Sequence, residues 1–212
     1  MHRRFFFTRF GLTAAALGYG SPRLTAAQPS PPSSWQAARH ETDGWLDTLP
    51  GKHRVLFDTW NAPNFPDAVL FVGNTYRANR DGYSLGDSDL AVVLCVHHQT
   101  APFAFNDAMW AKYGKAFSKR MQWVDPKTQE APATNIYLRQ LTNYVKQGMH
   151  FAVCNMTTRA YTQIIADETK RSTDEVYKEL TSNTIGSAHF VPAGVVTATR
   201  AQEHGYTIIS IG

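Results

Sequence analysis

The sequence has few cysteines and lacks the motifs of several common enzyme classes. Among 212 residues there are only two cysteines, Cys95 and Cys154, which are too few for a disulfide scaffold. There is no Gly-x-Gly-x-x-Gly after the first predicted strand, no Walker-type phosphate loop and no Gly-x-Ser-x-Gly elbow. Dinucleotide-dependent hydride transfer, nucleotide hydrolysis and serine esterase chemistry are therefore poorly supported.

The sequence also lacks the spacing of cysteines and histidines that is typical of metal-binding motifs. No Cys-x-x-Cys, His-x-x-x-His or His-Glu-x-x-His pattern occurs, and adjacent histidines on one strand point to opposite faces. The side chains that suit a soft or borderline ion are scattered: Cys95, Cys154, His97, His98, His150 and Met156. We therefore expect no metal site and no bound cofactor.

Acidic residues are absent from residues 1–27, which carry four arginines. Arg3 and Arg4 are followed by aromatic residues, a modest apolar stretch over 10–19 and small residues at 25–27. This arrangement is typical of a bacterial twin-arginine export leader, and the apolar stretch is too short for a stable transmembrane helix. We predict a periplasmic protein without a stable membrane span; an ordinary secretory leader and an uncleaved anchor are the alternatives.

Removal of this leader would balance the charge of the chain. The whole sequence has 21 basic and 17 acidic residues, and four of the basic ones lie in the leader, which leaves 17 of each sign. The basic excess therefore belongs to the precursor. A neutral chain without a basic stripe gives no reason to expect nucleic acid as a partner.

The sequence predicts one domain after a boundary segment. Residues 28–50 begin with a Pro/Ser-rich linker and continue into a short extension, in which Trp45, Leu46 and Leu49 would anchor one amphipathic turn. Residues 51–212 have an even composition without repeats. A segment of this length suits a single domain with a proper hydrophobic core.

Short apolar runs alternate with helical patterns along this domain. The expected strands cover 54–57, 89–96, a run ending at Cys154, and 206–210. The expected helices cover 67–80, 105–113, 136–146, 158–170, a segment capped by Ser172, and 192–205, with a long loop over 114–134. Strands separated by helices predict an α/β fold with a parallel sheet covered on both faces.

Cys154 ends an apolar run and directly precedes a predicted helix. The free N–H groups and positive dipole of a helix N-terminus favour a thiolate, and chemistry in α/β sheets gathers at the carboxyl ends of strands. The alternative is a buried small side chain at a strand end. If another strand separates Cys154 from Cys95, their backbones lie roughly 9–10 Å apart, so we expect both thiols to be free, with Cys95 buried.

Other polar residues are expected at the same edge of the sheet. The candidates are His97, His98, Asp58, Asn106, Asn155 and Arg159. One of His97 and His98 would hold the thiolate or orient a substrate. The alternative is that one of the two histidines caps the strand and the other is solvated. Arg159 would bind an anion such as a sulfur oxyanion, or be exposed. Asn106 would line the cleft or cap a helix, and Asp58 would line it or make a turn.

Six short segments, in this order and spacing, resemble the DsrE/DsrF-like family and within it an exported branch with twin-arginine leaders. They are GKHR at 51–54, VLCVHH at 93–98, FNDAMWAKY at 105–113, FAVCN at 151–155, PAGVV at 192–196 and RAQE at 200–203. The resemblance covers essentially all of 51–212. It implies a compact fold of about five strands, usually assembled as homotrimers or larger rings.

In the sulfur-relay members of that family, a cysteine after a central strand carries persulfide sulfur between partner proteins. Cys154 falls at that position. The chain departs from those members in its export leader, its long middle insertion and its Asn155-Met156-Thr157 segment, where many of them have a glycine. The relay members are mostly cytoplasmic and work in hetero-complexes.

We therefore expect a flavodoxin-like three-layer sandwich with a mostly parallel sheet, assembled as a homo-oligomer such as a trimer or hexamer. The leading hypothesis is a thiol-based role in sulfur metabolism. Cys154 would accept or carry sulfane sulfur from a small sulfur compound or a donor protein, as a possible sulfurtransferase-like carrier. The alternatives are a non-catalytic periplasmic protein that binds a small ligand or metal in the same cleft, and a subunit that acts through assembly alone.

Overall fold

A computed structural model describes residues 36–212, and residues 37–212 form one compact unit. The predicted leader and most of the predicted linker lie outside the described residues. Within the part that is described, no helix combines the length and the apolar character that crossing a membrane requires.

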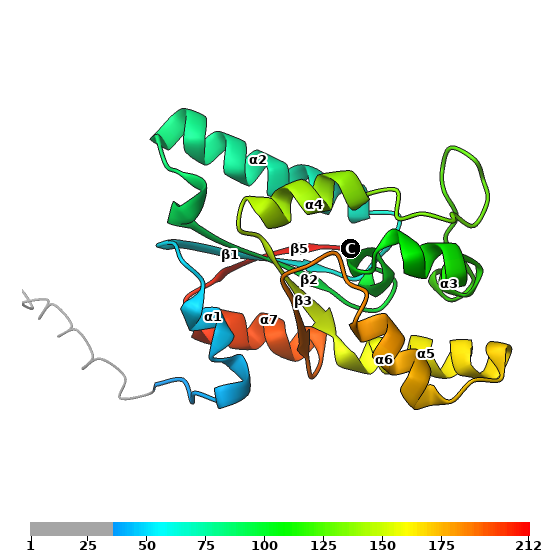
Figure 1. Ribbon diagram of the computed structural model, residues 1–212. Helices are drawn as coiled ribbons and strands as arrows, with labels where there is room; N and C mark the ends of the chain where they lie inside the picture. The colour runs from blue at the N-terminus through cyan, green and yellow to red at the C-terminus, as the bar shows by residue number, and fades with distance from the viewer. Residues whose placement is uncertain (1–35) are drawn as a thin grey trace, which may run out of the picture. The chain divides into compact units, whose positions relative to one another are not determined.

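Five strands form a single parallel sheet (Figure 1). They are β1 (His53–Thr59), β2 (Leu90–Val96), β3 (His150–Cys154), β4 (Ala188–Val191) and β5 (Thr207–Ile211). The strand order is β4-β3-β2-β1-β5, and every neighbouring pair is parallel. The sequence did not indicate β4, because its four residues are too short a run for a recognisable alternation and Pro192 follows at once.

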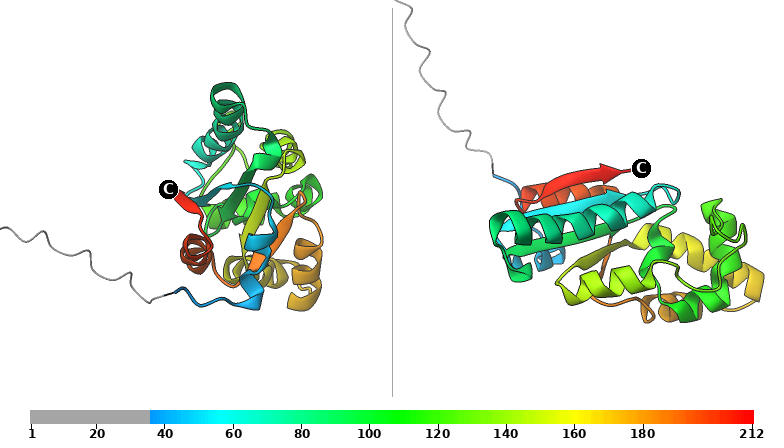
Figure 2. Two further views of the ribbon diagram at one scale, coloured as in Figure 1. Left: turned by 90° about the vertical axis from the view of Figure 1, so that its left-hand side faces the viewer. Right: turned by 90° about the horizontal axis from the view of Figure 1, so that it is seen from above.

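Helices cover both faces of the sheet and its carboxyl end. They are α1 (Trp45–Thr48), α2 (Phe65–Tyr83), α3 (Asp107–Met121), α4 (Leu138–Lys146), α5 (Asn155–Thr169), α6 (Thr173–Thr181) and α7 (Gly194–Glu203), with 3-10 turns at Glu41–Asp43, Asp87–Asp89 and Ala101–Ala104. Helices α2 and α4 lie on one face, and α1 and α7 lie on the other (Figures 1 and 2). This arrangement confirms the flavodoxin-like three-layer sandwich, although β1 lies between β2 and β5, whereas the flavodoxin strand order places β1 between β2 and β3.

Successive side chains of β2 point to opposite faces of the sheet and so belong to two separate hydrophobic clusters. All seven residues of β2 are buried, as expected for a central parallel strand. Leu94 and Val96 belong to the cluster under α2 and α4, whereas Val93 and Cys95 belong to the cluster under α1 and α7. Side chains at the carboxyl edge of the sheet are therefore assigned to a face by their position along each strand.

The short turn expected near Trp45 is part of the second cluster. Leu46 and Leu49 are buried beneath α1, as predicted. The carbonyl of Leu46 accepts hydrogen bonds from the Arg54 guanidinium at 2.7 Å and from the Tyr206 hydroxyl at 2.8 Å. These contacts hold α1 against the sheet, because they satisfy a carbonyl at the end of a helix that is only one turn long.

The predicted loop over 114–134 is wrong in its first part, because α3 continues to Met121. Gly114 does not end the helix. It lies where the Pro132 carbonyl oxygen packs against α3, and a Cβ there would come within 2.1 Å of that oxygen. Phe117 and Met121 are fully buried, so tertiary packing extends the helix past a residue with low helix propensity.

Candidate functional site

Cys154 is the N-cap residue of α5 and the last residue of β3. It follows the apolar strand that the sequence indicated, and its extended backbone turns the chain into the helix. Its sulfur Sγ accepts hydrogen bonds from the backbone N–H of Thr157 at 3.5 Å and from the Thr157 hydroxyl at 3.3 Å. The residue is 4% exposed, so a thiolate there depends on these donors and on the helix N-terminus for stabilisation.

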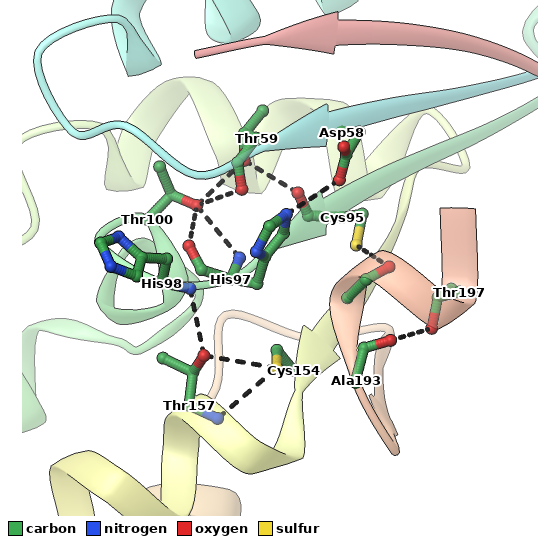
Figure 3. Close-up of polar contacts among 11 residues, drawn as sticks. Asp58, Thr59, Cys95, His97, His98, Thr100, Cys154, Thr157, Ala193 and Thr197 are labelled. Atoms are coloured by element: carbon green, nitrogen blue, oxygen red, sulfur yellow. Dashed lines mark hydrogen bonds and ion pairs between the residues drawn. The ribbon is translucent and has the colours of Figure 1, made fainter. Parts of the chain in front are cut away.

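Thr157 connects Cys154 to the turn after β2 (Figure 3). Its hydroxyl oxygen accepts a hydrogen bond from the backbone N–H of His98 at 3.1 Å while its proton is directed to Cys154. His98 has a positive φ of 51°, and its carbonyl accepts from the Tyr161 hydroxyl at 3.4 Å. The backbone of His98 therefore orients the Thr157 hydroxyl, whereas its side chain is exposed.

His97 is held by a carboxylate and by a glycine. Its Nε2 lies 3.0 Å from Oδ1 of Asp58, and both side chains are 13% exposed. The ring packs on Gly194 at the start of α7, where a Cβ would come within 2.6 Å of the ring. The carboxylate fixes the orientation of the imidazole, which leaves Nδ1 as the nitrogen available for proton transfer.

Strand register brings His97 and Cys154 to neighbouring positions. Cys95 pairs with Ala152, and His97 and Cys154 each come two residues later. Side chains two residues apart on a strand share a face, so both lie on the α7 face at the carboxyl edge. Asp58 joins them because it pairs with Cys95 on the other side of β2.

Both cysteines are free, as expected, but not for the expected reason. No strand separates them, since β2 and β3 are neighbours. Cys95 pairs with Ala152, so its backbone is offset from Cys154 by two residues, about 8 Å between Cα atoms from standard strand spacings, beyond disulfide reach. Burial, followed by the charges of Asp58 and Cys154, raises the pKa of the Cys95 thiol well above its usual value.

A pair of buried hydroxyls fixes the strand ends that carry Asp58 and His97. The Thr59 hydroxyl donates to the Cys95 carbonyl at 2.8 Å and lies 3.0 Å from the Thr100 hydroxyl. Thr100 in turn lies 2.9 Å from the His97 carbonyl and 3.1 Å from its backbone nitrogen. This network is satisfied within the fold, so it holds the turn after β2 in one conformation.

Three of the predicted binding residues have structural partners of their own. The Asn155 side-chain oxygen accepts from the Tyr177 hydroxyl at 2.7 Å, and the exposed Arg159 stacks over the Tyr177 ring at 4.4 Å. Asn106 caps α3 by accepting from the Met109 N–H at 3.4 Å, which is the helix-capping alternative. Among the predicted residues, the structure gathers Cys154, His97 and Asp58.

Thr157 and Gly194 are site residues that the sequence analysis did not single out. Thr157 stands three residues after an N-cap, the spacing from which a side chain and backbone N–H reach back to the cap, so this signal was present in the sequence. Gly194 gave no local signal, because its contact with His97 joins segments almost a hundred residues apart.

No protein-family model and no curated protein matches the chain. Among solved structures, the protein of unknown function MTH1491 from Methanobacterium thermoautotrophicum superposes with a TM-score of 0.43 at 14% identity. The match covers 75% of this chain and 99% of that chain. A likeness at this level supports no inference about function.

Cys154, with Thr157 and His97 at the same carboxyl edge of the sheet, has the groups that thiol chemistry requires. Within residues 36–212, no three His, Cys, Asp or Glu side chains converge as a metal centre would require. A sulfur with two donors and a carboxylate-bound imidazole follow neighbouring strands, so a nucleophile and a group that can exchange protons are carried by the same edge of the sheet.

Proposed function

We propose that Cys154 accepts and carries sulfane sulfur, and that the protein has a thiol-based role in sulfur metabolism. The observation that carries this proposal is the pair of hydrogen bonds from Thr157 to Cys154 Sγ, at 3.5 and 3.3 Å. Donors at a helix N-terminus stabilise the thiolate that attacks the donor, and the positive end of the helix also favours the negative outer sulfur of the persulfide that forms. The resemblance to the DsrE/DsrF-like family points to the same residue.

The transfer step requires no oxidant or reductant. The Cys154 thiolate attacks the outer, sulfane sulfur of a donor persulfide, and an S–S bond to Cys154 forms as the donor's own S–S bond breaks. The donor leaves as a thiolate, and the sulfane sulfur keeps its oxidation state. His97, held by Asp58, is the group that gives a proton to the leaving thiolate or takes one from the incoming persulfide.

The cellular setting follows from the sequence patterns. The twin arginines support export to the periplasm, where the donor would be a small sulfur compound or a partner protein. Assembly as a homo-oligomer, a trimer or hexamer by the family resemblance, is part of the proposal. Light scattering on the protein at tens of micromolar tests it, and a clean monomer would refute it.

Intact-mass measurement after incubation with inorganic polysulfide tests the proposed chemistry. The wild type should gain about 32 Da, one sulfur atom, and lose it on treatment with a reducing thiol. Cys154→Ser should gain nothing, while the matched variant Cys95→Ala should load as the wild type does. Loading of Cys154→Ser at the wild-type rate would end the carrier hypothesis and favour a non-catalytic binding role.

Variants of Thr157 test whether its hydroxyl supports the sulfur. Thr157→Val keeps the backbone N–H and removes the hydroxyl, so loading at mildly acidic pH should slow about tenfold, the effect of losing one hydrogen bond to a charged group. Thr157→Ser restores the hydroxyl and should restore the rate. Equal rates for both variants would show that the hydroxyl has no role in the transfer.

A further inference from the structure

The two outer strands of the sheet differ in how they are protected. Strand β4, at one edge, has four residues, of which three are partly buried and the last is buried. Trp45 of α1 stacks on its His189 with the ring centroids 4.0 Å apart, and Pro192 follows the strand at once. Short length, cover by another element and a nearby proline all keep an edge strand from pairing with another chain.

Strand β5, at the other edge beside β1, lacks this protection in the part of the chain that the structure describes (Figure 2). Its sequence, Thr-Ile-Ile-Ser-Ile at 207–211, contains no charged residue, no proline and no glycine. Three of its five residues are exposed, and Ile209 is 39% exposed. Every second residue of an edge strand directs its N–H and C=O away from the sheet, so β5 offers free backbone groups to another strand.

Exposed apolar side chains of α2 and β5 lie on the same side of this edge. Ile209 pairs with Phe57 of β1, whose side chain belongs to the cluster under α2, so Ile209 also faces α2. Thr75 of α2 lines a groove together with Ile209. Phe71, which is 41% exposed, lies one helical turn before Thr75, and its carbonyl accepts from the Thr75 hydroxyl at 2.9 Å. A strand added beside β5 would therefore cover apolar surface as well as backbone groups.

We propose that β5 pairs antiparallel with β5 of a second copy of this chain, which joins two five-stranded sheets into one. The strand's own sequence points to this occupant, because the register that places Ile209 opposite Ile209 of the second copy uses all five residues of both strands. This register pairs Thr207 with Ile211 and Ile208 with Ser210. Each pair combines β-branched or hydroxyl side chains and opposes no charges, which favours antiparallel strand pairing.

The charges at the two ends of β5 suit the antiparallel arrangement. At the amino end, the groove that Ile209 lines also contains the basic residues Lys52, His53 and Arg54, and no acidic residue lines it. At the carboxyl end, the first turn of α2 carries the exposed Asp67, the single charged residue between positions 59 and 76. Antiparallel pairing brings the amino end of each edge to the carboxyl end of the other, so opposite charges meet at both ends.

The same surface patch contributes from both copies, so this interface closes after two copies and requires an even number of subunits. It is satisfied by a dimer, or by two trimers that associate into a hexamer. The inference specifies the homo-oligomeric assembly that is part of the proposed function, and it does not depend on the sulfur chemistry. Cys154 ends β3, three strands away from β5, so the pairing leaves the thiol site uncovered.

Sedimentation equilibrium on the full-length protein at tens of micromolar tests the interface. The wild type should have an even number of subunits, and Ile209→Lys should halve the mass, because a charge on an edge strand opposes pairing with its own copy. The matched variant Leu70→Lys changes an apolar residue of α2 that is 52% exposed and lines the groove on the side of Tyr144, so it should keep the wild-type mass. Circular dichroism verifies that both variants are folded.

Cross-linking tests the register. Directly opposite residues of antiparallel strands have Cα atoms about 4.5–5.5 Å apart, within disulfide reach. With Cys95→Ala and Cys154→Ser in the same chain, Ile209→Cys should form a covalent dimer on oxidation with diamide, and Leu70→Cys should not.

Three results would overturn the proposal: a wild-type monomer, an odd number of subunits, or a mass that Ile209→Lys leaves unchanged. A monomer would refute the assembly as a whole, whereas an unchanged mass in Ile209→Lys would refute the β5 interface alone. Sulfur loading of the wild type decides the carrier hypothesis separately from both.

Discussion

At the scale of single residues, the two cysteines have opposite environments within one sheet. Cys95 is fully buried in β2, and the Gly194 carbonyl, at 3.8 Å, is the hydrogen-bond acceptor of its sulfur among residues 36–212. Cys154 receives two hydrogen bonds at the start of α5. The two sulfur atoms therefore differ in their surroundings, a buried strand with one acceptor for Cys95 and a helix N-terminus with two donors for Cys154.

Alkylation should therefore modify Cys154 first. Burial raises the pKa of Cys95 and shields its sulfur, whereas the sulfur of Cys154 lies at the sheet edge beside two donors. Brief treatment of the native protein with iodoacetamide at mildly acidic pH, followed by peptide mapping, measures the ratio. We expect modification of Cys154 alone; equal labelling of the two thiols, or faster labelling of Cys95, would contradict the prediction.

At the scale of elements, helices α3 and α6 are joined by a network of charged side chains. Glu179 accepts hydrogen bonds from Lys112, Arg171 and the Tyr113 hydroxyl. Burial by itself would raise the pKa of Glu179, but these three donors outweigh it and lower the pKa to about 2. The network joins α3 to α6, which in turn packs against α5, the helix that carries Cys154 as its cap.

Glu179 should make stability depend on pH at acid values. Its folded-state pKa of about 2 lies below the ordinary value of 4.5, so its contribution is present above that ordinary value and is lost as pH falls toward 2. Glu179→Gln should be less stable than the wild type near neutral pH, with a difference that narrows below pH 4.5. Urea unfolding across this range measures it.

The control for Glu179 is Glu168→Gln. Glu168 is 42% exposed and forms an ion pair with the exposed Lys119 at 3.1 Å, so its removal should cost little at any pH. Parallel stability curves for Glu179→Gln and the wild type over the whole pH range would show that the network does not stabilise the folded state.

Glycines in two helices should respond in opposite ways to the same substitution. Gly114→Ala should destabilise the protein by about 1–3 kcal/mol, because the new Cβ would come within 2.1 Å of the Pro132 carbonyl oxygen. Gly82→Ala in α2 meets no atom within 4 Å and should stabilise by about 0.4–1 kcal/mol. Chemical denaturation measures both, and a stabilising Gly114→Ala would mean that the 122–134 segment does not pack on α3.

At the scale of the whole molecule, charge divides the chain. The four arginines of residues 1–27 account for the whole excess of basic over acidic residues, and residues 28–212 are neutral overall. A charge that is concentrated at the start of the chain fits recognition during export, whereas a neutral remainder offers little like-charge repulsion to self-association.

Replacement of Arg3 and Arg4 by lysine tests the proposed route. The double variant keeps the charge but loses the paired guanidinium groups, and the two side chains are not equivalent in recognition. We expect the precursor to accumulate unprocessed in the cytoplasm, as measured by fractionation and immunoblotting. Normal arrival of the double-lysine variant in the periplasm would assign the leader to the general secretory route.

The sequence by itself determined the fold class and the place of Cys154. Continuous apolar runs, without the alternating polar residues of a strand that has one face in water, indicated buried parallel strands. A run that ends in cysteine directly before a helical pattern indicated a thiol at a helix N-terminus. These are local properties, set by neighbours within a few residues, so they can be predicted without a structure. The family resemblance, the export route and the sulfur chemistry remain predictions.

Only the tertiary structure decided which side chains meet. Strand order made β2 and β3 neighbours, register placed His97 beside Cys154, and the fold brought Asp58 to His97. It also placed Asn155 and Arg159 against Tyr177 and joined His150 to His189. Such contacts connect residues far apart in the chain, and their free energy depends on packing and register that no local pattern of residues encodes.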